Sequence, residues 1–260
     1  MKYGLIRFAC LFALVAGALG VSAATVVPGP QNLIAHKGNS GLKVYKENTV
    51  AAAQDVVAHG FAFENDVQVA KNGVLYLNHD RQARDYPADW PDTFELTLKM
   101  LPTGAVYKVD AKCGLAGLDR LIAAVKADNT TARALLAFNT TEQTFADRIH
   151  AELPGAQVWV SVSVPRKKVY DQAKEAEKIV HTCRALKAEG ISLRWDAALC
   201  TPAFFKTLND AGIVIDVWTV DKAEVAKEAI RRGARFVTTN RPIPIVTEWS
   251  ASTPPQPPAK

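Results

Sequence analysis

Apolar and polar positions along the chain follow two alternating periods. Short, mostly apolar runs rich in β-branched residues recur at eight places between residues 33 and 239, separated by polar or turn-forming stretches. They predict strands at 33–36, 61–67, 105–110, 133–138, 157–163, 190–194, 213–219 and 235–239. Because the runs are nearly continuous in apolar residues, we expect buried parallel strands rather than strands with one face in water.

Apolar residues recur at helical spacing between these runs. The pattern predicts helices at 48–59, 115–127, 141–151, 170–188, 201–211 and 221–232, with a weaker pattern near 93–101. Several open with a Thr, Asp or Asn cap, and for the first helix Asn48 or Thr49 can serve. Eight strands alternating with about eight helices predict an α/β protein, a (β/α)8 TIM barrel in a single domain, whose chemistry lies at the carboxyl ends of the strands.

The two ends of the chain do not fit this pattern. Lys2 and Arg7 precede an apolar run at 8–21 that ends in Val-Ser-Ala-Ala, which predicts a secretory signal peptide over 1–23. The run is short for a membrane span, so we expect an exported protein, periplasmic or secreted. Residues 250–260 contain four prolines among small polar residues and predict a flexible tail, which leaves 30–248 as the barrel domain.

Composition and charge narrow the classes of protein further. The 260 residues are 48% hydrophobic, which excludes collagen-like and disordered chains. The 31 basic and 26 acidic residues are too evenly balanced for a dedicated nucleic-acid-binding protein. Cys113, Cys183 and Cys200 remain after export and show no zinc-site spacing. They allow either one disulfide with a leftover thiol or three buried thiols.

Polar side chains gather where the first three predicted strands end. Glu64 and Asp66 are two residues apart on the second strand, and Asp110 and Lys112 are two apart at the end of the third. Residues two apart on a strand share a face, so both pairs can face the barrel mouth together. Three converging carboxylates repel one another, and a hard cation such as Mg²⁺ or Ca²⁺ neutralises them most directly. His36 and His79 remain as proton donors and acceptors.

Six short motifs occur in an order that matches a known family. They read IAHKG, ENT, ENDV, NHD, VDAK and VWTV, and TTNRP follows the last of them. In this order the sequence resembles the glycerophosphodiester phosphodiesterase family over about residues 33–245. The resemblance implies a TIM barrel and an enzyme that hydrolyses phosphoric diesters with a divalent cation.

Residue roles follow from the resemblance by position. It implies that Glu64, Asp66 and Asp110 bind one divalent cation, Mg²⁺ or Ca²⁺, and that His36 and His79 act as general acid and base. It also implies that Lys37, Lys112 and Trp218 bind the substrate and that Glu47 supports the site. Which histidine is the acid stays open, as does whether water or a neighbouring substrate hydroxyl attacks phosphorus.

The sequence departs from the family pattern at four points. Lys37 replaces the usual arginine and so loses a two-pronged grip on phosphate oxygens, and Asn240 replaces the usual aspartate. Asp110 stands where many members have glutamate, and only 31 residues separate His79 from Asp110. The last two features resemble the sphingomyelinase D-like relatives.

These observations favour one function and leave two alternatives. The first is an exported, metal-dependent phosphodiesterase that releases an alcohol and glycerol 3-phosphate from glycerophosphodiesters. The second is a phospholipase D-like enzyme that cleaves or cyclises lysophospholipid or sphingomyelin head groups, and the third is a catalytically weak barrel that binds anionic ligands. We expect a small phosphodiester or lipid head group as substrate, with peripheral membrane contact left open. No nucleic acid and no obligate protein partner are inferred.

Overall fold

The computed structural model describes residues 28–165 and 169–251. The predicted signal peptide and residues 252–260 of the predicted tail lie outside the described residues. Within them the strands are β1 (Leu33–Ala35), β2 (Ala62–Val69), β3 (Leu75–Leu77), β4 (Val106–Asp110), β5 (Leu135–Asn139), β6 (Gln157–Val162), β7 (Gly190–Arg194), β8 (Val214–Trp218) and β9 (Phe236–Thr239). The α-helices are α1 (Val50–Ala58), α2 (Phe94–Met100), α3 (Gly114–Ala127), α4 (Gln143–Glu152), α5 (Gln172–Leu186), α6 (Pro202–Asp210), α7 (Ala223–Arg232) and α8 (Pro242–Ala251).

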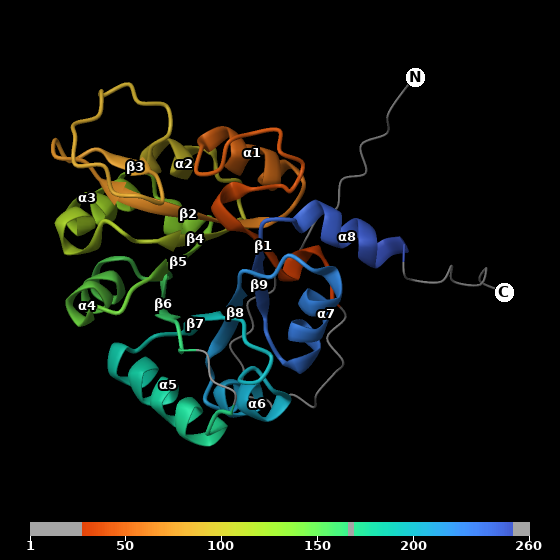
Figure 1. Ribbon diagram of the computed structural model, residues 1–260. Helices are drawn as coiled ribbons and strands as arrows, with labels where there is room; N and C mark the ends of the chain where they lie inside the picture. The colour runs from red at the N-terminus through yellow and green to blue at the C-terminus, as the bar shows by residue number, and fades with distance from the viewer. Residues whose placement is uncertain (1–27, 166–168, 252–260) are drawn as a thin grey trace.

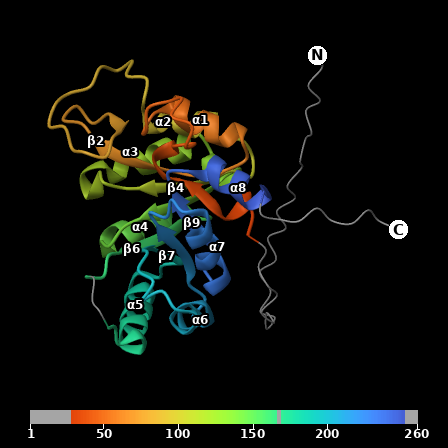
Figure 2. The ribbon, with the colours of Figure 1, turned by 45° about the vertical axis from the view of Figure 1, so that its right-hand side comes forward.

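Eight of these strands form a closed parallel barrel. Each strand from β4 to β9 pairs with its neighbour along the chain, β2 pairs with β4, and β1 pairs with both β9 and β2. The helices lie around the outside of the strands, as two views of the molecule show (Figures 1 and 2). The predicted (β/α)8 TIM barrel in a single domain is therefore confirmed.

Two elements of the described chain differ from the predicted pattern. β3 pairs antiparallel with the carboxyl end of β2, where Val67 lies opposite Leu77. β3 therefore forms a hairpin with β2 and is not one of the eight barrel strands. The loop after β3 projects from the barrel in Figure 1. α8 follows β9 and includes Ser250 and Ala251, two residues that the sequence assigned to the tail. Two prolines near its start, Pro242 and Pro244, had hidden this helix from the pattern.

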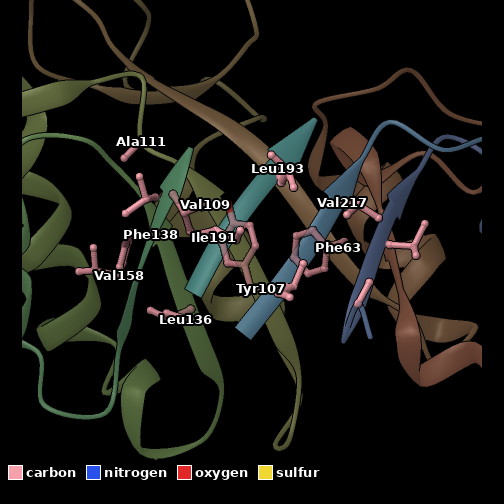
Figure 3. Close-up of a cluster of buried hydrophobic side chains, with 14 of the residues drawn as sticks. Phe63, Tyr107, Val109, Ala111, Leu136, Phe138, Val158, Ile191, Leu193 and Val217 are labelled. Carbon is pink, nitrogen blue, oxygen red and sulfur yellow. The ribbon is translucent and has the colours of Figure 1, made fainter. Parts of the chain in front are cut away.

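The main core lies between the outer face of the strands and the helices. Alternate strand residues point outwards into it, and Figure 3 shows a group of them from Phe63 on β2 to Val217 on β8. The rings of Phe63 and Tyr107 stack with centroids 4.5 Å apart, which joins β2 to β4. Because outward-pointing residues supply this core, the other alternate residues are free to fill the barrel interior.

A polar network occupies the middle of that interior. Lys108 on β4 is buried, and its Nζ lies 2.7 Å from Asp216 Oδ2 on β8. Ser192 and Thr238 complete the network, because the hydroxyl of each donates to the Asp216 carboxylate. The sequence analysis did not single out these four residues. A buried ammonium requires such a carboxylate partner, so the pair fixes β4 against β8 across the barrel.

The three cysteines of the described chain are free thiols and are buried. Burial raises the pKa of Cys113 to about 12 and those of Cys183 and Cys200 to about 11. The structure therefore favours the buried-thiol alternative over a disulfide. Among the described residues, no helix combines the length and apolar character needed to cross a membrane.

Candidate active site

The three predicted metal-ligating carboxylates converge inside the rim of the barrel. Glu64 and Asp66 point inwards from β2, and Asp110 ends β4 directly opposite Asp66 in the strand register. One ligand atom from each lies within 4.8 Å of the other two. Glu64 is only 3% exposed and Asp66 is buried as well, while Asp110 is half-buried and closer to solvent.

Two groups from the β1–α1 loop hold these carboxylates in place. The Lys37 backbone N–H donates to Glu64 Oε2 at 2.8 Å. Asn48 is buried, donates from Nδ2 to Asp66 Oδ2 at 2.8 Å and accepts the Asp66 backbone N–H on Oδ1 at 3.0 Å. Lys37 and Asn48 both have positive φ, 55° each, which turns the loop back towards the strands. Of the two residues that the sequence offers as the cap of the first helix, Asn48 and Thr49, it is Thr49 that caps α1, and Asn48 belongs to the site.

The three carboxylates of the site carry more negative charge than Lys112 alone neutralises. Burial, followed by repulsion from Asp66, raises the pKa of Glu64 to about 8. Lys112 lies between two carboxylates, with Nζ 3.3 Å from Asp66 and 3.2 Å from Asp110. Burial alone would lower the pKa of Lys112, but the attraction of Asp110 and Asp66 outweighs it and raises that pKa.

The three carboxylates fit a hard divalent cation. All their ligand atoms are oxygens, the donors that Mg²⁺ and Ca²⁺ prefer. Burial and then the charge of Asp66 raise the pKa of Glu64, so a bound cation would favour its ionised form. Glu64, Asp66 and Asp110 would hold the ion, with Asn48 and the Lys37 backbone fixing two of them.

His36 follows β1 at the rim and is oriented by Asn240, which follows β9, and through it by Asp221 between β8 and α7. Its Nδ1 lies 2.8 Å from Asn240 Oδ1, and its Nε2 lies 4.0 Å from Glu64 Oε2. Asn240 in turn donates from Nδ2 to Asp221 Oδ2 at 2.9 Å. Burial lowers the pKa of His36, although the hydrogen bond with Asn240 opposes the shift.

His79 faces solvent on the segment that follows β3. Its side chain is 54% exposed, and its Nδ1 lies 2.8 Å from Asp80 Oδ1. The segment is tied to the carboxylates because the Asn78 backbone N–H donates to the Asp66 carbonyl at 3.0 Å. A cleft runs between this segment and the β1–α1 loop, and His79, Lys37, Lys46 and Asn48 are among the residues that line it.

The remaining predicted side chains lie at the same end of the barrel. Lys37 Nζ donates to Glu47 Oε1 at 3.1 Å, so Glu47 fixes a lysine of the cleft. Trp218 ends β8 at the rim, is half-buried and lies opposite Arg194 in the register. The structure therefore gathers the predicted side chains at the carboxyl ends of the strands.

Three residues support the two histidines without having been assigned that role from the sequence. Asn240 contacts His36, Asp221 contacts Asn240, and Asp80 contacts His79. Asn240 stood out only as a departure from the family, and its position suggested a structural role at the end of the last strand. Asp221 lies 19 residues before it, so no local pattern could pair them. Asp80 was visible in the NHD motif as a neighbour of His79.

Comparisons with known proteins bear on this geometry. Residues 36–145 match the Glycerophosphoryl diester phosphodiesterase family, and they contain His36, His79 and the three carboxylates. No curated protein sequence matches the chain.

Solved structures share the fold at low sequence identity. A structure from Galdieria sulphuraria superposes with a TM-score of 0.69 at 13% identity, covering 88% of this chain and 100% of its own. A glycerophosphodiester phosphodiesterase from Parabacteroides distasonis has a TM-score of 0.66 at 16% identity, covering 85% and 98%. A phosphodiesterase from Oleispira antarctica, in complex with the product sn-glycerol-3-phosphate, has a TM-score of 0.60 at 17% identity, covering 85% and 97%.

The family match spans the segment that carries both histidines and all three carboxylates, and the rest of the chain completes the barrel. Over residues 36–145 the chain is therefore similar to the Glycerophosphoryl diester phosphodiesterase family, and over most of its length it shares the TIM-barrel fold of the solved structures.

Proposed function

We propose that this protein is an exported, metal-dependent phosphodiesterase that hydrolyses glycerophosphodiesters to an alcohol and glycerol 3-phosphate. The observation that carries the proposal is the convergence of Glu64, Asp66 and Asp110 within 4.8 Å, with His36 beside them. The solved phosphodiesterase from Oleispira antarctica, which contains sn-glycerol-3-phosphate, supports glycerol 3-phosphate as the product.

Hydrogen-bond directions favour His36 as the general base. The Asp221 carboxylate only accepts, so the Asn240 amide turns its Nδ2 towards Asp221 and its Oδ1 towards His36. His36 must then donate from Nδ1, which leaves a lone pair on Nε2, the nitrogen that lies 4.0 Å from Glu64 Oε2. That nitrogen accepts the proton of the attacking water or substrate hydroxyl.

His79 is suited to the role of general acid. The Asp80 carboxylate accepts a hydrogen bond from His79 Nδ1, and this bond lowers the pKa of Asp80. The exposed ring lines the cleft and can give a proton to the departing alkoxide oxygen.

The lysines and the carboxylate cluster serve the phosphate group. A divalent ion held by Glu64, Asp66 and Asp110 would supply positive charge for the phosphoryl oxygens. Lys112 contacts Asp66 and Asp110, and Lys37 lines the cleft, so their ammonium groups can bind the remaining oxygens.

The activity is tested by ³¹P NMR on the mature protein with glycerophosphocholine, with Mg²⁺ or Ca²⁺ and with EDTA. We expect glycerol 3-phosphate only when a divalent cation is present, and loss of turnover by at least about 100-fold in His36→Ala and His79→Ala. His59→Ala is the matched control, because this exposed histidine lies on the solvent side near the end of α1. Full turnover in either site variant, or in EDTA, would refute the mechanism.

The phospholipase D-like alternative is a second arm of the same experiment. Its support is Asp110 in place of glutamate and the short connection after His79. Lysophosphatidylcholine and sphingomyelin replace glycerophosphocholine in this arm. A cyclic phosphate or phosphomonoester formed from the lipids alone would move the protein to that alternative, and binding without turnover would favour the anionic-ligand barrel.

Export is a separate part of the proposal. It is supported by the cationic start, the apolar run at 8–21 and the Val-Ser-Ala-Ala site. The protein should be recovered from periplasm or medium, and its mass should correspond to a chain that starts at Ala24. A cytoplasmic protein that retains residues 1–23 would contradict it.

A further inference from the structure

The β1–α1 loop carries an exposed apolar tip beside the cleft. Leu42, Val44 and Tyr45 are 50%, 62% and 50% exposed. They make up half of the exposed large hydrophobic residues found in the described chain, and the others, Leu96, Leu115 and Val169, lie apart from them in the sequence. Isolated exposed apolar residues are normal on a protein surface, but three within four positions of one loop indicate an interaction site.

Both ends of this loop are fastened, so the tip is held outwards. At one end Ser40 is buried, and a Cβ on Gly41 would lie 2.9 Å from the backbone of Arg241, so this part packs tightly before α8. At the other end the buried Asn48 donates its backbone N–H to the Lys37 carbonyl at 2.8 Å. The tip between them, residues 42–46, is exposed throughout.

The charge of the tip indicates the chemistry of its partner. The sequence reads Leu-Lys-Val-Tyr-Lys, so Lys43 and Lys46 alternate with the apolar residues and no carboxylate occurs within it. Glu47, the next residue, is engaged by Lys37 instead. Lysines next to an aromatic and two aliphatic side chains suit an anionic lipid surface, where the apolar groups enter the interface and the ammonium groups meet head-group phosphates.

We propose that residues 42–46 form a peripheral docking loop for anionic phospholipid membranes. The role of the docked loop in catalysis rests on the proposed function. Because Lys46 also lines the cleft, docking would bring the cleft to the plane of the phosphodiester head groups. The apolar and cationic residues give two attractions at once, and stable attachment to a membrane surface generally takes two such signals.

The loop is tested by co-sedimentation of the mature protein with phosphatidylcholine vesicles and with equimolar phosphatidylcholine and phosphatidylglycerol vesicles, in EDTA to prevent turnover. We expect binding to the anionic vesicles that weakens with salt and at least about tenfold weaker binding for the triple variant Leu42→Ser, Val44→Ser, Tyr45→Ser. The matched control is Leu96→Ser with Leu115→Ser, which removes exposed leucines on α2 and α3 and should bind as the wild type does.

Three outcomes would overturn the proposal. The first is equal binding of the triple variant and the wild type, and the second is no binding of the wild type to anionic vesicles. The third is a wild-type dimer in size-exclusion chromatography that the triple variant converts to a monomer, because the tip would then contact a second copy of this chain. The triple variant should hydrolyse soluble glycerophosphocholine at the wild-type rate, so loss of vesicle binding and failure of the proposed catalysis give distinct results.

Discussion

At the scale of single residues, the ion pair inside the barrel makes the fold sensitive to the loss of either partner. Lys108 and Asp216 are both buried, and the Nζ to Oδ2 distance is 2.7 Å. Removing one partner of such a pair leaves the other charge without compensation in a dry interior.

Asp216→Asn should therefore lower the free energy of unfolding by about 3–5 kcal/mol, while keeping the size of the side chain. Asp210→Asn is the control, because Asp210 pairs with Lys206 on the surface of α6, and exposed pairs contribute about 0–1 kcal/mol. Urea unfolding followed by circular dichroism measures both. A loss below about 1 kcal/mol for Asp216→Asn would show that the network does not stabilise the fold.

Asn240 gives a residue-scale test of how His36 is oriented. Asn240→Leu removes the side-chain bonds to His36 and to Asp221 and keeps a side chain branched at Cγ. We expect kcat on glycerophosphocholine to fall about 10–100-fold with KM little changed, because an unheld imidazole spends less time in the reactive orientation. Asn209→Leu, the same exchange at an exposed position on α6, should leave both constants unchanged. An unaltered kcat in Asn240→Leu would remove Asn240 from the catalytic arrangement.

At the scale of elements, local sequence signals predicted most of the barrel. All eight barrel strands were visible because buried parallel strands are apolar on both faces. β3 was missed because three residues, Leu75–Leu77, are too few to show a period, and the strand depends on its antiparallel pairing with β2. α8 was missed because prolines were read as breakers, although the first turn of a helix tolerates them.

The cap of α6 offers a prediction at this scale. The Thr201 side chain accepts the Phe204 backbone N–H at 3.3 Å and donates to Gln172 Oε1 on α5 at 2.7 Å. Thr201→Ala should lower the free energy of unfolding by about 1 kcal/mol, as loss of a helix cap usually does. Thr207→Ala, at an exposed position in the middle of α6, should change the free energy of unfolding by no more than about 0.5 kcal/mol. Equal effects in urea unfolding would show that the cap adds nothing.

At the scale of the whole molecule, the barrel brings together residues that no local pattern connects. The motifs at residues 36, 64–66 and 110 predicted the carboxylates and His36, because strand alternation decides which side chains face inwards. Lys108 escaped notice because its partners lie 84, 108 and 130 residues away. Contacts across a closed barrel depend on strand register, which the spacing of apolar residues does not specify.

The carboxylate cluster should link the stability of the whole barrel to pH and to metal. In the folded chain the pKa of Glu64 is about 8, because burial and then the charge of Asp66 disfavour its ionised form, whereas an ordinary glutamate has a pKa of 4.5. Between these values the folded state retains a proton that the unfolded state has released. Raising the pH from about 5 to 8 in EDTA should therefore lower the free energy of unfolding, by at most about 1.4 kcal/mol per pH unit.

Glu64→Gln should remove most of this slope, because its amide does not titrate, whereas Glu224→Gln on exposed α7 should retain it. Mg²⁺ or Ca²⁺ should raise the wild-type stability most at pH 8, since the ion binds the ionised carboxylates and only the folded chain holds the three together. Urea unfolding at several pH values, with EDTA or with the cation, measures both effects. If wild type and Glu64→Gln kept the same slope in EDTA, Glu64 would not be the group that links stability to pH, and a cation bound there would lose its electrostatic support.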